Sequence, residues 1–136
     1  MKSKEEQDSG IGLKSPDELC EASKHSADGF LAVLRSEKAF RTDLVVFVVC
    51  MCIALAIPRL SACERALMIY VVFLPLVAEL VNTAIERTID RISTDYHRLS
   101  GLAKDIGSAA VSAAFVGAGI CWSVILTGWA FRVFWK

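Results

Sequence analysis

The chain has 136 residues, enough for a single domain, and 54% of them are hydrophobic. Its mean hydropathy of +0.48 is too high for an ordinary soluble domain. The 15 basic and 15 acidic residues cancel, so no global positive charge points to nucleic acid, and we expect no such partner.

The N-terminal part contains two different segments. Residues 1–14 are polar and are predicted to be a disordered tail. Ser15, Pro16 and Glu18 then have the spacing of a helix start, with Ser as N-cap, Pro in the first turn and Glu as capping-box partner. A patchy apolar face follows, so residues 15–38 are predicted to form an amphipathic surface helix. We expect this helix and the rest, residues 15–136, to form one membrane domain.

Three apolar segments follow and are predicted to cross a membrane as helices, at about residues 40–60, 66–86 and 106–131. The first is apolar at its centre, the second has Glu79 as its only charge up to residue 85, and the third has no charge. A soluble helical bundle would need polar faces on these helices, and the sequence does not provide them.

Lysine and arginine near the ends of the spans predict the orientation. Eight lie before the first span or between the second and third: Lys24, Arg35, Lys38, Arg41, Arg87, Arg91, Arg98 and Lys104. Four lie on the other side: Arg59, Arg65, Arg132 and Lys136. Because cytoplasmic loops carry the excess of positive charge, the N-terminus is predicted to be cytoplasmic.

A polar stripe lies within the second span. Glu79, Asn82 and Glu86 fall on one face of a helix, where ionisable groups are costly in lipid. They could be structural and protonated, could line an ion pathway, or could hold a metal and activate a nucleophile. Their depth near the cytoplasmic interface, with Glu37 and Lys104 at the same level, favours Mg²⁺ and a phosphate substrate. The alternative is a non-enzymatic pore or scaffold subunit.

The third span is rich in small residues. Ala110, Ala114 and Ala118 repeat every four residues, as do Ala113 and Gly117. Small residues at this spacing allow helices to approach closely in lipid. Three helices enclose little interior, so we expect self-association; the alternative is that the stripe serves packing within one chain.

Two segments carry a family resemblance. AELVNTAIERTIDRISTDYHRLSGLAKDIGSAAV strongly resembles the small trimeric diacylglycerol kinases of bacterial inner membranes. SEKAFRTD resembles the corner at which their surface helix enters the membrane. The likeness extends roughly from Ser26 to Trp129. The family usually has other residues at the positions of Glu18, His25 and Leu102.

The resemblance implies an all-α membrane protein, with an N-terminal amphipathic surface helix and three transmembrane helices in a homotrimeric bundle. It implies an ATP- and Mg²⁺-dependent lipid kinase of the bacterial inner membrane. Such a kinase transfers the γ-phosphate of ATP to the hydroxyl of diacylglycerol, giving phosphatidic acid for phospholipid metabolism. Its sites would be shared between subunits.

The resemblance also implies residue roles. By position, Glu79 resembles the catalytic carboxylate that accepts the lipid hydroxyl's proton, and Asn82 an organiser in the same cluster. Glu37 and Glu86 resemble the Mg²⁺ ligands. The positions that resemble nucleotide contacts are Glu37, Glu86, Asp95, Tyr96, His97, Lys104 and Asp105. Those that resemble lipid contacts, besides Glu79, are Ala39, Phe40, Arg41, Thr42, Asp43, Ser108 and Trp122.

The related kinases form two branches that phosphorylate different lipids, diacylglycerol or undecaprenol. Undecaprenol kinases share the E-x-x-N-x-A-I-E core, so the carboxylates alone do not distinguish between the two substrates. Gly107-Ser108 at the start of the third span resembles the diacylglycerol branch. A serine hydroxyl there can pair with the ester and hydroxyl groups of a glycerol backbone, whereas a polyprenol offers only one hydroxyl on an otherwise apolar chain. The sequence therefore favours diacylglycerol, with undecaprenol as the alternative.

Overall fold

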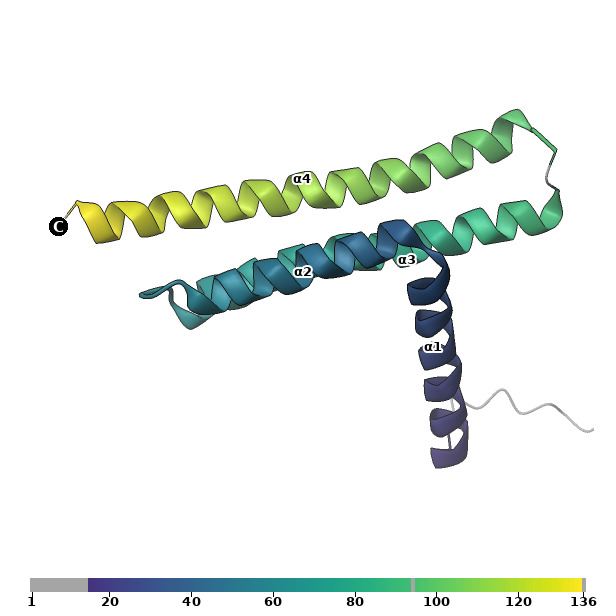
Figure 1. The fold of residues 1–136 in the computed structure, drawn as a ribbon, viewed down its shortest axis with the longest axis horizontal. Coiled ribbons are helices and arrows are strands. Elements are labelled where there is room, and N and C mark those ends of the chain that lie inside the picture. Colours follow the sequence, from purple (N-terminus) through teal and green to yellow (C-terminus); the bar gives the residue numbers. More distant parts are fainter. Residues whose placement is uncertain (1–14, 94, 136) are drawn as a thin grey trace, which may run out of the picture. The chain divides into compact units, whose positions relative to one another are not determined.

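The protein is built from four helices, as a computed structural model that describes residues 15–93 and 95–135 shows (Figure 1). They are α1 (Pro16–Ser36), α2 (Lys38–Ala56), α3 (Ala62–Ile92) and α4 (Arg98–Phe134), and the described residues contain no strand. The chain divides into two units, one ending at Ala32 and the other beginning at Val33. The predicted disordered tail, residues 1–14, lies outside the described residues.

Helix α1 begins at the predicted signature. The backbone N–H of Ser15 donates to Glu18 Oε2 at 2.8 Å, and the Glu18 N–H donates to Ser15 Oγ at 3.3 Å. These two bonds form a capping box, which satisfies backbone donors that the first turn would otherwise leave unpaired. The predicted capping box is therefore confirmed, and Glu18 has a structural role in it.

Helices α2, α3 and α4 are each long and apolar enough to cross a membrane. Their 19, 31 and 37 residues correspond to about 28, 46 and 55 Å of helix, against a hydrocarbon core of about 30 Å. The prediction of an all-α membrane protein with three apolar spanning helices is confirmed. Helix α2 ends at Ala56 because Pro58 disfavours helical backbone in the residue before it.

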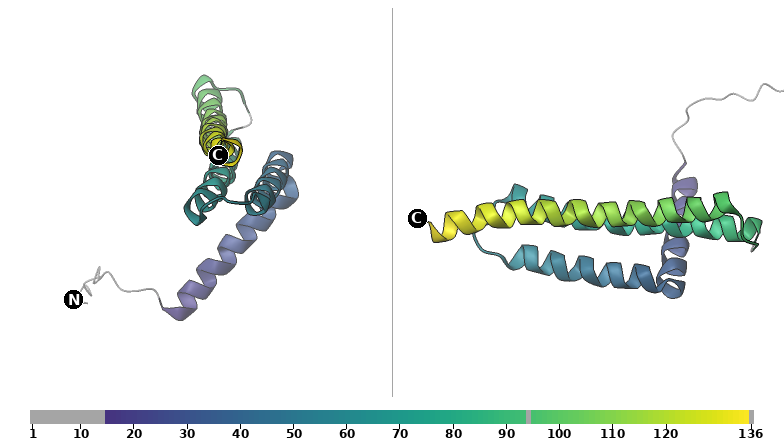
Figure 2. Two further views of the ribbon diagram at one scale, coloured as in Figure 1. Left: turned by 90° about the vertical axis from the view of Figure 1, so that its left-hand side faces the viewer. Right: turned by 90° about the horizontal axis from the view of Figure 1, so that it is seen from above.

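Helix α3 is the central helix of the second unit. It packs against both α2 and α4, and it runs beside α4 for most of its length (Figures 1 and 2). One core cluster consists of Val33, Phe40 and Leu76, and the other of Ala54, Leu60 and Met68. The two clusters lie at different levels along α3.

Polar contacts hold the helices together at the end away from the α3–α4 connection. The Arg65 guanidinium donates to the carbonyls of Ala54 and Leu55, both at 2.6 Å, and so caps the C-terminus of α2. Arg132 on α4 pairs with Glu64 on α3 at 2.6 Å. Two of the four basic residues that the sequence places on this side therefore serve helix packing.

The three long helices bury little of their apolar surface within one chain. The buried share of the most apolar window is 11% in α2, 33% in α3 and 6% in α4. Large exposed side chains, including Val45, Val116 and Ile120, cover the remainder. A surface this apolar requires lipid or other protein around it. Of the three helices, α3 has the largest buried share.

Candidate active site

The polar stripe of α3 points into the protein. Glu79 is 8% exposed, Asn82 7% and Thr83 4%, whereas neighbouring Val81 is 56% exposed. The stripe therefore faces the other helices, and the exposed face of α3 at this level is apolar. This is the arrangement expected of ionisable groups inside a membrane that serve a site.

Asn82 joins this stripe to Glu86. The Asn82 amide nitrogen Nδ2 donates to Glu86 Oε1 at 3.1 Å, between residues one helical turn apart. The amide oxygen Oδ1 is buried and accepts no hydrogen bond from the described residues. Asn82 thus fixes one oxygen of the Glu86 carboxylate, as an organising residue would.

Three further carboxylates lie close enough to Glu79 to act on it electrostatically: Asp43, Glu86 and Glu37. Asp43 is half-buried on α2, five residues after the start of that helix. The sequence places Asp43 only among the lipid-contacting residues, whereas the structure brings it to the same acidic group as Glu79. The site therefore contains four carboxylates from α2, α3 and the residue between α1 and α2.

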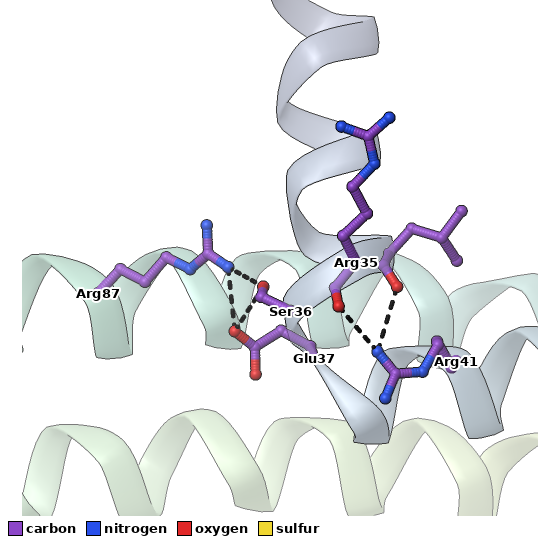
Figure 3. A network of polar contacts seen from close by, with 6 residues as sticks. Arg35, Ser36, Glu37, Arg41 and Arg87 are labelled. Atoms are coloured by element: carbon purple, nitrogen blue, oxygen red, sulfur yellow. Dashed lines mark hydrogen bonds and ion pairs between the residues drawn. The ribbon is translucent and has the colours of Figure 1, made fainter.

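Glu37 lies at the N-cap of α2 and is ion-paired (Figure 3). The Arg87 guanidinium donates to Glu37 Oε1 at 3.0 Å and also to Ser36 Oγ. The hydrogen bond from Arg87, and after it the one from Ser36, hold the pKa of the Glu37 carboxyl below its usual range. Glu37 is therefore a stable anion beside the polar stripe.

The corner between α1 and α2 is held by Arg41. Its guanidinium donates to the carbonyls of Leu34 at 3.3 Å and Arg35 at 3.1 Å, at the C-terminus of α1 (Figure 3). Phe40 is fully buried against Val33 and Leu76. Of the predicted lipid contacts in this corner, Arg41 and Phe40 therefore have packing roles, and Ala39 and Thr42 are exposed.

The connection between α3 and α4 carries the predicted nucleotide contacts. Asp95, Tyr96 and His97 are exposed, Tyr96 by 89%. His97 is the N-cap of α4, and its Nδ1 accepts from the Leu99 N–H at 3.3 Å. Asp105 is exposed about two turns into α4. These residues are gathered at one end of the α3–α4 hairpin.

Lys104 pairs with a residue that the sequence analysis missed. Its Nζ donates to Asp90 Oδ1 at 2.5 Å, which links α4 to α3. Asp90 lies four residues after Glu86, so it extends the polar face of α3 by one turn. That spacing was visible in the sequence and could have identified Asp90.

Arg87 was also missed as a site residue. Arg87, Thr88, Arg91 and Ile92 line a pocket of about 540 Å³ at the end of α3. Arginine is a residue that suits an anionic ligand at such a place. The sequence analysis counted both arginines for orientation only, because their direction around α3 depends on the packing of the corner.

Two predicted lipid contacts on α4 lie far from each other. Ser108 is exposed, while Trp122 donates from Nε1 to the Met68 carbonyl at 3.0 Å. Fourteen residues of helix separate them by about 21 Å. Trp122 therefore joins α4 to α3, and only Ser108 lies at the level of the carboxylates.

The donor set suits a metal that brings most of its own ligands. The described residues contain no group of three His, Cys, Asp or Glu side chains arranged to hold a metal ion. Mg²⁺ commonly binds one or two carboxylates and completes its shell with water and substrate phosphates. Glu86 and Glu37 are oxygen donors of this kind, so the residues fit Mg²⁺ carried by a nucleotide.

Comparison with known protein families shows the family to which the chain belongs. The model of the family "Prokaryotic diacylglycerol kinase" matches residues 24–126, which include every element of the polar site. The chain belongs to this family. It is therefore a membrane-embedded kinase, and the pore or scaffold alternative is not favoured.

Relatives agree with the family match. The chain is 44% identical over 117 residues to a diacylglycerol kinase of Pseudomonas aeruginosa, covering 86% of this chain and 92% of the relative. It is 40% identical over 108 residues to a diacylglycerol kinase of Escherichia coli K12, covering 79% and 88%. A Haemophilus influenzae diacylglycerol kinase is 40% identical over 109 residues, covering 79% and 91%.

Proposed function

We propose that this protein transfers the γ-phosphate of ATP to the free hydroxyl of diacylglycerol, giving phosphatidic acid and ADP. The observation that carries the proposal is the polar face of α3, on which Glu79 and Asn82 are buried and Asn82 is hydrogen-bonded to Glu86. Arg87, the residue after Glu86, is ion-paired with Glu37. Phosphoryl transfer depends on alignment and charge neutralisation, and a membrane interface is where ATP and a lipid hydroxyl can meet.

Glu79 is the proposed general base. Its carboxylate takes the proton from the lipid hydroxyl while that oxygen forms a bond to the γ-phosphorus. The bond between the γ-phosphorus and its bridging oxygen to the β-phosphate breaks, and ADP leaves with the electron pair. Burial of Glu79 keeps bulk water away, which limits hydrolysis of ATP.

Glu86 and Glu37 would hold the metal, with Asn82 fixing Glu86. Mg²⁺, when bound, neutralises phosphate charge and orients the γ-phosphate. Arg87, which pairs with Glu37, would then be released toward a phosphate. The remaining proposed nucleotide contacts are Asp95, Tyr96, His97, Lys104 and Asp105, and Asp90 holds Lys104 in place.

Around the lipid headgroup we propose Ala39, Thr42, Asp43 and Ser108. They lie in the first two turns of α2 or, in the case of Ser108, at the level of the carboxylates on α4. Arg41 and Phe40 support this region through packing, while Trp122 joins α4 to α3 farther along the helix. Ser108 is the proposed partner of the glycerol backbone, for which a polyprenol has no counterpart.

We also propose the assembly and location. Residues 15–136 would act as one kinase domain, with α1 at the cytoplasmic surface of the bacterial inner membrane and α2–α4 each crossing it. The chain would assemble as a homotrimer that completes the site between subunits. The large apolar surface of α2 and α4 and the small residues of α4 support association with other copies.

A comparison of lipid acceptors tests the proposed substrate. Purified protein receives diacylglycerol and undecaprenol at equal surface concentration, with Mg²⁺ and ATP. Diacylglycerol should be phosphorylated faster, and Ser108→Ala should narrow the difference, while Ser123→Ala, about four turns farther along α4, should not. A clear preference for undecaprenol would overturn the substrate and leave the kinase chemistry standing.

A further inference from the structure

Gly107 on α4 lies directly against the side chain of Asn82. A Cβ built on Gly107 would come within 3.2 Å of Asn82 Cγ and closer still to Oδ1. Real Cβ atoms essentially never approach other atoms as closely as this one would approach Oδ1. With a side chain at position 107, either the Asn82 amide or α4 would have to move.

The backbone at Gly107 gives no other reason for glycine. It lies inside the long helix α4, and no described glycine of the chain has a positive φ. Glycine within a helix costs about 1 kcal/mol relative to alanine, so its presence there calls for a packing or functional reason. The contact with Asn82 supplies one.

The contact fixes the direction of the Asn82 amide. The Cα–H bond of Gly107 that a Cβ would replace points at Oδ1, a weak contact common between packed helices. On the other side, Nδ2 donates to Glu86 Oε1 at 3.1 Å. Turning the amide over would set Oδ1 against a carboxylate and Nδ2 against a C–H group, so this orientation is preferred.

We infer that Gly107 is a positioning residue for the kinase site: it holds the Asn82 amide so that Asn82 holds the Glu86 carboxylate for Mg²⁺-bound nucleotide. Gly107 does not touch the reacting atoms. Its effect passes through two side chains, from α4 to α3, and one oxygen of Glu86 remains for the ligand. This inference rests on the proposed role of Glu86.

The test compares Gly107→Ala, Asn82→Ala and the double variant. Gly107→Ala should raise the KM for Mg·ATP and lower kcat/KM about 10-fold or more, the size of a lost hydrogen bond to a charged group. Asn82→Ala removes the atoms that the new Cβ would meet. The double variant should therefore match Asn82→Ala, because the two changes act through one contact.

A second readout does not depend on activity. In the absence of lipid, Mg·ATP should raise the unfolding temperature of the wild type, and the rise should shrink equally in all three variants. Gly128→Ala is the matched control on α4, since its Cβ would meet only the far end of the Arg132 side chain at 3.8 Å. Its Mg·ATP response should equal that of the wild type.

Several results would overturn the inference. They are an unchanged Mg·ATP response in Gly107→Ala, an equal loss in Gly128→Ala, or an additional loss when Gly107→Ala is added to Asn82→Ala. If Gly107→Ala alone does not fold, the double variant should fold, and its failure to fold would also contradict the inference. A wild type that binds Mg·ATP but does not phosphorylate diacylglycerol would refute the proposed substrate and leave this comparison intact.

Discussion

Replacing Glu79 by glutamine removes the proposed base and little else. Glutamine has nearly the same shape, and Glu79 is 8% exposed, so bulk water has little access to take over proton abstraction. General base catalysis contributes about 10²- to 10⁴-fold, which corresponds to about 2.7–5.4 kcal/mol in the barrier. We therefore expect kcat to fall about 100-fold or more.

Binding of the nucleotide should survive this change. The Asn82–Glu86 bond and the Glu37–Arg87 pair do not include Glu79, so the KM for Mg·ATP should stay within about threefold. The fold should survive as well, because removing one negative charge from a group of four relieves repulsion. The unfolding temperature should stay equal or rise.

Glu64→Gln is the matched control on the same helix. Glu64 lies at the start of α3, where it completes a capping box with Ser61 and pairs with Arg132. Glutamine can also complete a capping box, so activity should be retained. Steady-state assays of both variants with saturating lipid provide the comparison. Near-full turnover in Glu79→Gln would refute the assignment of Glu79 as base.

Three further predictions concern the other carboxylates and the assembly. Glu37→Ala and Glu86→Ala should each raise the Mg²⁺ and ATP needed for half-maximal rate, and additive losses in the double variant would assign them to separate sites. Because Arg87 lowers the pKa of Glu37, the stability from this pair is present above the ordinary carboxyl pKa and lost as pH falls through the lowered value. Arg87→Ala should therefore move the acid limb of an unfolding titration to higher pH, and an unmoved limb would contradict the pairing. Mixed oligomers of Glu79→Gln and Glu86→Ala chains should regain activity, whereas no rescue would indicate sites built within one chain.

Patterns local in the chain were predicted well. The capping box of Ser15 and Glu18 depends on residues three apart, and the polar face of α3 follows from helical spacing alone. The three apolar helices were predicted from hydropathy, although α3 continues to Ile92, beyond the predicted span. Hydropathy predicts the part of a helix that can lie in lipid. It does not predict the turns by which the helix continues beyond the membrane.

Contacts between distant residues were not predictable in this way. Arg87 reaches Glu37 across fifty residues of sequence, and Gly107 meets Asn82 across a helix interface. Neither contact leaves a periodic signal, because each depends on how one helix is rotated against another. Phe40 is a further case, since its burial depends on Val33 and Leu76 closing over it from two other helices.

The most direct test of the central claim is the fate of the γ-phosphate. Purified protein in vesicles that contain diacylglycerol receives Mg²⁺ and ATP labelled at the γ-phosphate. The label should appear in phosphatidic acid, in proportion to the ADP formed, and this transfer should be lost in Glu79→Gln. ATP hydrolysis without labelled lipid, or equal labelling by wild type and Glu79→Gln, would contradict the account.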